Sequence, residues 1–296
     1  MKKIDIILLV TLAAIWGSSF VFMRISVEAF GAIALNAVRI SVAALFLLGF
    51  LLQKKRRVEF IKNWRILLII GLVNSALPFC LLAYSSLTLS GGTVSILNAI
   101  TPIFTAWIAH FWLKDTLNRQ QMLGLFISIS GMCYLVWDKV DWSLASWLPI
   151  LAGIVASLSY GFASNATKKY LKEISTMTSS AGSLFFSAIF VVTIALFFLP
   201  STQHITSHEW SSAIMLGILC TGIAFMIYFR LVKSIGPART ASVTFLIPIF
   251  AFIWGYLFLG EVVTIRMWIA TIIILSGMSL VLQRRYGDRY SESESG

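Results

Sequence analysis

"LNAITPIFTAWIAHFWLKD" (Leu97–Asp115) returns in altered form as "VTFLIPIFAFIWGYLFLGE" (Val243–Glu261). Both stretches place Pro-Ile-Phe in the middle of an apolar run and end in a leucine, one further residue and a carboxylate. Pro102 and Pro248 lie 146 residues apart (248 − 102) in a chain of 296 residues. Because this offset is close to half the chain, it indicates an internal duplication.

The composition is that of a membrane protein. The chain is 58% hydrophobic and 12% charged, with a mean hydropathy of +0.89, whereas soluble domains carry about 25% charged residues. The apolar residues form runs of roughly 17 to 25, the length with which a helix crosses a bilayer core. We therefore predict an all-α integral membrane protein with ten transmembrane helices, over residues 4–23, 32–52, 66–87, 93–113, 121–137, 145–167, 175–199, 210–232, 240–259 and 267–282.

The loops between these runs are short and leave no room for a soluble domain. The first run follows Lys2 and Lys3 and is similar to a signal peptide. It lacks a convincing cleavage site, however, and nine further runs follow, so we predict a helix there.

Basic residues predict the orientation, since cytoplasmic loops collect Lys and Arg. If the N-terminus is cytoplasmic, 19 of the 23 Lys and Arg fall inside, Arg24, Lys139 and Arg266 fall outside, and Arg39 lies within a span. We expect a multi-pass protein of the inner or plasma membrane with both termini in the cytoplasm. The net charge of +11 then reflects topology and contact with anionic lipid headgroups rather than nucleic acid binding.

Ten spans in two similar halves give five spans per half, and an odd number inverts the second half relative to the first. Further matches support the duplication: Gly17 stands seven residues before Arg24 and Gly161 seven before Lys168, while Gly131 and Gly277 are again 146 residues apart. We expect a first repeat at residues 1–140, an inverted second repeat at 141–286 and a polar tail at 287–296.

The stretch from Leu216 to Glu261 closely resembles the second repeat of the EamA family in the drug/metabolite transporter superfamily. The resemblance rests on Gly236-Pro237, on the helix around Pro248 and on the ending Leu259-Gly260-Glu261. "AIWGSSFVFMR" and "NAVRIS" resemble the family's first repeat, so that almost the whole chain is covered. One departure is Lys114-Asp115, which stands where Gly-Glu is usual.

The resemblance implies a ten-helix carrier for small organic metabolites, since many members export amino acids and their relatives. Inverted repeats suit alternating access around a central cavity, with the substrate held near the midplane. We therefore expect a secondary transporter, working outward, whose partners are a small-molecule substrate and the lipid bilayer, and which is a monomer or a weak homodimer. Two alternatives stay open: an importer or uniporter of a cationic amine or other solute, and a flippase-like protein for lipid-linked compounds.

The prolines indicate where the substrate path lies. A proline within a helix frees the carbonyl four residues earlier, which belongs to Asn98 for Pro102 and to Thr244 for Pro248. Either each Asn or Thr side chain caps a packing kink, or these positions line the path. Carriers of the family line their cavity with spans one, three, six and eight, which implies binding roles for Trp16, Asn74, Tyr160 and Tyr228. Together with Asn98 and Thr244 from the proline positions, these are the predicted substrate-binding residues.

Arg39 is the one charge well inside a span, and an ionisable residue at such depth is a functional hypothesis. It either holds a substrate carboxylate, sets the outer gate, reaches outward to the headgroups or pairs with Glu28. With Pro102 and Pro248 it forms the predicted kink and gating set. Asp115 and Glu261, at helix ends, are expected to make fold-fixing contacts.

The sequence offers little for enzyme chemistry, and we predict no catalytic residue, cofactor or metal site. The three cysteines are odd in number and scattered through the spans, and there is no P-loop for ATP. His204 and His208 have i, i+4 spacing but no partner acid. Since no carboxylate lies in the middle of a span, His110 is the one intramembrane group suited to titrate at ordinary pH; we expect at most weak coupling to protons.

Overall fold

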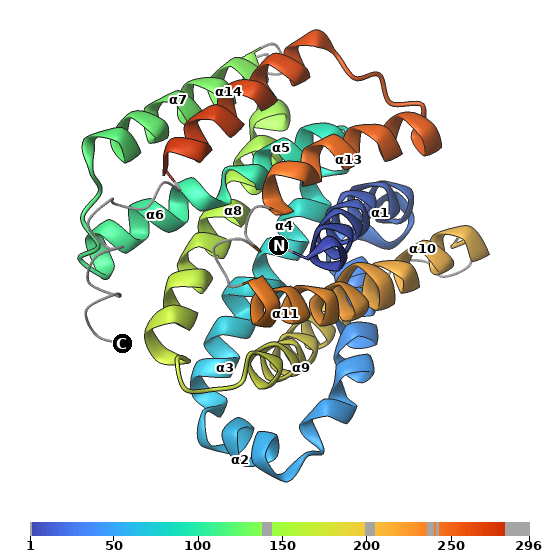
Figure 1. The fold of residues 1–296 in the computed structure, drawn as a ribbon. Helices are drawn as coiled ribbons and strands as arrows, with labels where there is room; N and C mark the ends of the chain where they lie inside the picture. Colours follow the sequence, from blue (N-terminus) through green and yellow to red (C-terminus); the bar gives the residue numbers. More distant parts are fainter. Residues whose placement is uncertain (1, 138–143, 199–204, 236–239, 241–242, 282–296) are drawn as a thin grey trace.

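The computed structural model describes residues 2–137, 144–198, 205–235, 240 and 243–281, and this part of the chain is helical, without a β-strand (Figure 1). The predicted all-α class is therefore confirmed. His204, the Gly236-Pro237 turn and the polar tail 287–296 lie outside the described residues. The elements are α1 (Lys3–Leu51), α2 (Lys54–Lys62), α3 (Trp64–Gly71), η1 (Leu72–Ala76), α4 (Leu77–Ser85), α5 (Gly91–Ala99), α6 (Thr101–Trp112), α7 (Arg119–Val136), α8 (Leu144–Tyr170), α9 (Thr176–Ala195), α10 (Ser207–Gly217), η4 (Ile218–Ile223), α11 (Ala224–Ile235), α13 (Val243–Leu259) and α14 (Ile265–Val281).

Six helical stretches in the described part of the chain are long and apolar enough to cross a bilayer, among them α9 and the combined α5 and α6. The helices α13 and α14 are equally apolar but have 17 residues each. The first stretch, α1, has 49 residues and contains two of the predicted runs. It bends at Gly31, whose φ of 72° is open to glycine at little cost, so its two limbs take different directions.

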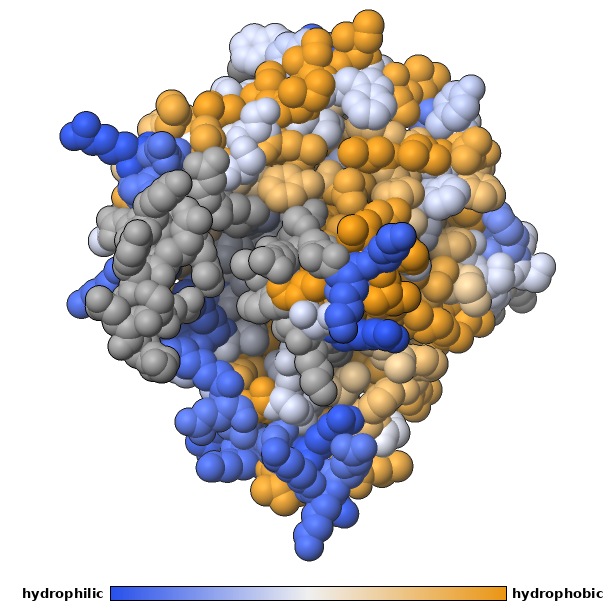
Figure 2. Space-filling view, viewed as in Figure 1, coloured by the Kyte–Doolittle hydropathy of each residue, from blue (hydrophilic) through white to orange (hydrophobic). Residues whose placement is uncertain are grey.

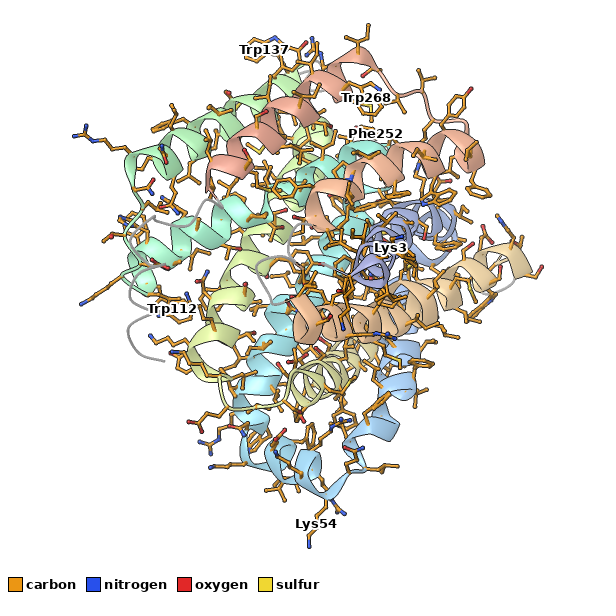
Figure 3. All side chains as sticks on the ribbon, in the orientation of Figure 1. Lys3, Lys54, Trp112, Trp137, Phe252 and Trp268 are labelled. Carbon is orange, nitrogen blue, oxygen red and sulfur yellow. The ribbon has the colours of Figure 1, made fainter. Side chains whose placement is uncertain are left out.

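The surface is apolar where a lipid-embedded protein would meet acyl chains. Large side chains such as Phe126, Phe197 and Phe258 are more than half exposed, at 68%, 81% and 69%. Figure 2 shows apolar side chains spread over the face that carries α13 and α14, while hydrophilic side chains gather over α2. Lys54 projects from that helix at the margin of the molecule (Figure 3), as expected for a basic loop at a headgroup surface.

Two helix pairs make the same close contact in the two halves of the chain. A Cβ at Gly17 of α1 would lie 2.6 Å from the Cβ of Phe250 in α13, and a Cβ at Gly161 of α8 would lie 3.0 Å from the Cβ of Phe104 in α6. Phe104 and Phe250 are 146 residues apart. In each case a helix that opens one half of the chain packs, through a glycine, on the proline-bearing segment of the other half.

The last helices of the two halves, α7 and α14, lie side by side at one edge of the bundle (Figure 1). Ser128 Oγ donates to the carbonyl of Ile274 across this contact, at 3.2 Å. A Cβ on Gly124 would collide with the backbone carbonyl of Gly277 and lie 2.9 Å from Leu280 Cβ. Small residues allow such backbone contact between membrane helices, where dispersion rather than the hydrophobic effect drives association. Phe252 and Trp268 close the neighbouring gap between α13 and α14, with ring centroids 5.2 Å apart (Figure 3).

We predict that Gly124→Leu forces α7 and α14 apart and destabilises the fold by about 2 kcal/mol or more, the cost of overpacking a tight contact. The matched control is Gly49→Leu, since no atom lies within 4 Å of a Cβ built at Gly49. Monodisperse yield and thermal midpoint in detergent measure the effect. Equal tolerance of both variants would contradict this role for the α7–α14 contact.

Candidate functional site

A cavity of about 1140 Å³ lies at the centre of the bundle. Residues of both halves of the chain form its wall, and they come from α1, α3, η1, α4, α5, α6, α7, α8, α9, η4, α11, α13 and α14. The wall mixes aromatic rings with hydroxyl and amide groups, which is the composition of a site for an amphipathic small molecule.

Most of the residues that the sequence singles out meet at this cavity. The wall includes Trp16, Arg39, Asn74, Asn98, Pro102, Tyr160, Tyr228 and Thr244. Pro248 is different, because it is buried within α13 and does not belong to the wall. The structure thus brings these eight residues together around one cavity. That they bind the substrate stays a prediction.

The two prolines differ in their effect on the helix. At Pro102 the helix is interrupted, since α5 ends at Ala99 and α6 begins at Thr101, whereas α13 runs unbroken through Pro248. The carbonyl of Asn98 accepts a hydrogen bond from Thr101 Oγ at 2.8 Å. The side-chain Oδ1 of Asn98 is buried and has no hydrogen-bond partner in the described residues. The interpretation in which the Asn98 side chain caps the kink is therefore wrong, because the hydroxyl of Thr101 takes that place.

Two π-helices, which the sequence analysis missed, bring further groups to the wall. The π-helix η1 follows Gly71 and η4 follows Gly217, again 146 residues apart. They carry Asn74 and Cys220, which both line the cavity. π-Helical turns are frequent at functional sites. The one signal in the sequence is the shared register of Gly71 and Gly217, each of which packs against the backbone of a neighbouring helix.

Arg39 is buried, with 6% of its surface exposed, and lines the cavity. Its Cζ lies 3.8 Å from the centroid of the Phe79 ring, and its Nε donates to Thr221 Oγ1 at 3.2 Å. The alternative in which Arg39 pairs with Glu28 is wrong, because the Glu28 carboxylate pairs with Arg24 at 3.0 Å. The cation is held by an aromatic face and a hydroxyl, neither of which neutralises its charge.

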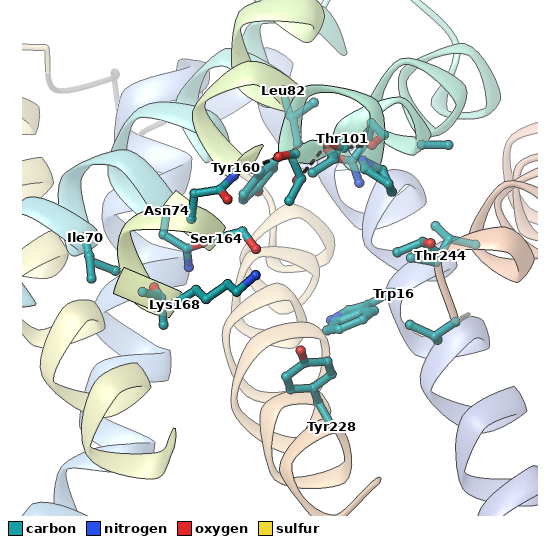
Figure 4. A pocket seen from close by; sticks show the side chains of 18 of the residues that line it. Trp16, Ile70, Asn74, Leu82, Thr101, Tyr160, Ser164, Lys168, Tyr228 and Thr244 are labelled. Atoms are coloured by element: carbon teal, nitrogen blue, oxygen red, sulfur yellow. Dashed lines mark hydrogen bonds between the residues drawn. The ribbon is translucent and has the colours of Figure 1, made fainter. Parts of the chain in front are cut away.

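Aromatic pairs form two parts of the wall. Trp16 and Tyr228 lie with ring centroids 5.8 Å apart, and Phe79 and Tyr160 lie 6.4 Å apart. In Figure 4 the Trp16–Tyr228 pair lies on one side of the cavity, and Tyr160 lies on the other with Asn74 and Ser164. The cavity therefore presents aromatic faces from both halves of the chain.

One end of the cavity reaches the surface. Its wall there includes Asp115 and Lys168, which are 66% and 62% exposed and form an ion pair at 3.7 Å. The sequence predicts a contact of Asp115 at a helix end; the structure also places this residue at the mouth of the cavity. The residue before Asp115 is Lys114, which has a left-handed backbone conformation with a φ of 55°. Gly260, which precedes Glu261 in the second half, has a similar φ of 62°.

The other end of the cavity is closed by polar contacts. The Glu261 carboxylate accepts hydrogen bonds from the backbone N–H groups of Gly91 and Gly92, at 2.9 and 3.4 Å, so the predicted contact of Glu261 at a helix terminus is confirmed. Arg24 donates to the carbonyls of Ser86 and Leu87, at 2.8 and 3.1 Å. At this end the cavity is lined by the side chains of Phe20 and Met23, which are both buried.

A sequence model of the EamA-like transporter family matches this chain twice, over residues 3–137 and 147–283. The chain belongs to the EamA-like transporter family. It is a multi-pass membrane transporter and not an enzyme, as its relatives are named transporters or exporters.

Relatives with similar sequences match more than nine tenths of the chain. The uncharacterized transporter YoaV of Bacillus subtilis is 25% identical over 278 residues, which are 91% of this chain and 94% of that protein. A protein of Streptantibioticus cattleyicolor, named a probable terminal-alkyne amino-acid exporter, is 23% identical over 97% of this chain and 96% of its own length. A crystal structure with 15% sequence identity superposes with a TM-score of 0.67 over 95% of this chain and 96% of that one, and so shares its fold.

We predict that replacing Trp16, Asn98, Tyr160 or Tyr228 by Ala lowers transport about tenfold, because each change removes an aromatic face or an acceptor from the cavity wall. Protein yield and thermal midpoint should change much less. Trp107→Ala and Tyr256→Ala are matched controls, since these side chains are 50% and 65% exposed on the outer surface. Parallel loss of yield and transport in all four variants would assign these residues to packing.

Proposed function

We propose that this protein is a secondary transporter that exports small organic metabolites, such as amino acids or related amphipathic compounds, by alternating access. The observation that supports this best is the cavity of about 1140 Å³, whose wall includes the exposed Asp115 and Lys168 at one end and the buried Phe20 and Met23 at the other. A channel would need a continuous path, whereas a carrier exposes a central site to one side at a time.

We further propose ten crossings in two inverted repeats, residues 1–140 and 141–286. The two limbs of α1 count as separate crossings, while α3 to α4, α5 with α6, and α10 to α11 each form one. The double family match and the paired contacts of Gly17 and Gly161 support this arrangement. The basic α2 would then lie in the cytoplasm with both termini, and the open mouth at Asp115 and Lys168 would face the same side.

Alternating access requires that the two ends of the cavity exchange roles. Asp115 and Glu261 occupy the same position in the two repeats, 146 residues apart, and Lys168 and Arg24 are 144 residues apart. Glu261 and Arg24 hold the outer end through backbone groups, whereas Asp115 and Lys168 contact each other at the exposed mouth. We infer that the structure is the inward-facing state of the transport cycle.

The exporter of Streptantibioticus cattleyicolor and the polar and aromatic wall favour amino acids or similar amphipathic compounds as substrates. The purified protein in liposomes should exchange a labelled solute of this class when unlabelled solute is present on the far side. A screen of the common amino acids, with polyamines as a comparison, identifies the class. Exchange of polyamines alone would favour the cationic-amine alternative, and movement of labelled lipid alone would favour a flippase.

We predict that this exchange persists without a pH gradient and that His110→Ala keeps most of it. His110 Nδ1 accepts a hydrogen bond from the backbone N–H of Leu117 at 3.2 Å, so the ring holds the turn after α6. Phe111→Ala is the matched control, because the Phe111 ring packs on the His110 ring with centroids 4.9 Å apart. Strict dependence on an imposed proton gradient, abolished by His110→Ala alone, would make His110 the coupling site.

A further inference from the structure

We propose that Arg39 binds a carboxylate of the substrate and that the cavity therefore selects amphipathic acids over their uncharged analogues. The proposal deepens the proposed function, on which it rests, by assigning the substrate group that is recognised and the residue that recognises it.

The described wall carries one charge that has no counter-ion. The Arg, Lys, Asp and Glu residues of this wall are Arg39, Asp115 and Lys168, and the last two pair with each other. The ionisable side chains that surround Arg39 are Tyr160, Cys80 and Cys220, none of them a carboxylic acid. A buried cation without a counter-ion is costly, and inside a membrane such a residue is kept where it contacts a substrate or an ion.

The guanidinium group is held in place by contacts that leave its outer nitrogens available. One face is covered by the ring of Phe79, whose carbonyl accepts a hydrogen bond from Asn36 Nδ2 at 3.0 Å. Nε donates a hydrogen bond to the hydroxyl of Thr221. Within the described residues, this is the hydrogen bond that the Arg39 side chain makes. Since a guanidinium has five N–H donors, the two terminal nitrogens retain the planar fork that fits a carboxylate. Because Phe79 and Thr221 already restrict the Arg39 side chain, this side chain loses less conformational entropy when it binds a carboxylate.

Some positions of the wall recur in the two halves, but the charge of Arg39 does not recur. Phe79 and Phe225 are 146 residues apart, as are Asn98 and Thr244, and all four line the cavity. The residue 144 positions after Arg39, by the offset that relates Trp16 to Tyr160, is Ser183, whose hydroxyl donates within its own helix to the Ser180 carbonyl.

The unpaired charge of Arg39 makes the cavity polar in one direction. A bound acid would place its carboxylate on the first-half side, at Arg39. The Trp16–Tyr228 pair would then accept an apolar group or an ammonium group on its aromatic faces.

The test compares acids with their primary amides, which have nearly the same shape and lack the negative charge. Each common amino acid and its amide is titrated against the purified transporter, and ligand-induced thermal stabilisation or calorimetry gives the affinity. We expect at least one acid to bind about 10 to 100 times more tightly than its amide, the range for hydrogen bonds to charged groups. If no acid of the panel binds better than its amide, the proposal is wrong.

Variants assign the preference to Arg39. Arg39→Gln should remove the preference for the acid while the affinity for the amide stays nearly constant, and Arg39→Lys should retain part of it because it keeps the charge without the fork. Arg266→Gln is the matched control, since Arg266 lies over the ring of Tyr134 at 4.8 Å on an exposed face of the protein. Equal losses for acid and amide in both Arg39 variants would give Arg39 a purely structural role.

The outcome is separable from that of the proposed function. Selective, Arg39-dependent binding of acids without transport in liposomes would uphold the carboxylate site and contradict the transporter assignment. Transport of solutes without a preference for acids would do the reverse. If Arg39→Gln does not fold, Arg39→Lys and the acid-to-amide ratio of the unmodified protein still decide the question.

Discussion

A bilayer core offers no water to satisfy backbone N–H and C=O groups, and this constraint governs where the helices of this protein depart from regularity. The break before Pro102 leaves the Asn98 carbonyl to the hydroxyl of Thr101. The two π-helices begin at Gly71 and Gly217, where a neighbouring backbone lies too close for a side chain. Each of these irregularities borders the central cavity, so the site is built where the helices are least regular.

The close contacts of glycine explain how so many helices surround one cavity without filling it. Gly17 and Gly161 bring α1 against α13 and α8 against α6 at backbone distance. Gly124 and Gly277 do the same for α7 and α14, whose ends contribute Gln121 and Val281 to the cavity wall. At these contacts the backbones lie close together, whereas the larger side chains of Trp16, Tyr160 and Tyr228 line the cavity between the helices.

The sequence predicted the helical class, the family and most of the wall, because these depend on the length of apolar runs and on a repeat at a fixed offset. It also marked Arg39, since a charge inside an apolar run is conspicuous. It could not predict that Thr101 rather than the side chain of Asn98 satisfies the freed carbonyl, as both are polar and close in sequence. The π-helices escaped prediction because they depend on the packing of Gly71 on Ser183 and of Gly217 on Arg39, contacts between distant segments.

The contacts at the two ends of the cavity differ in strength, and this difference sets a resting preference. The Glu261 carboxylate and the Arg24 guanidinium each bind two backbone groups, and hydrogen bonds to charged groups contribute about 1.5–3 kcal/mol each. The ion pair of Asp115 and Lys168 at the other end is exposed, and such pairs contribute about 0–1 kcal/mol. The empty protein should therefore spend most of its time with the mouth at Asp115 accessible. Such a bias changes how quickly solute is captured from each side, but at equilibrium it leaves the solute at equal activity on both sides.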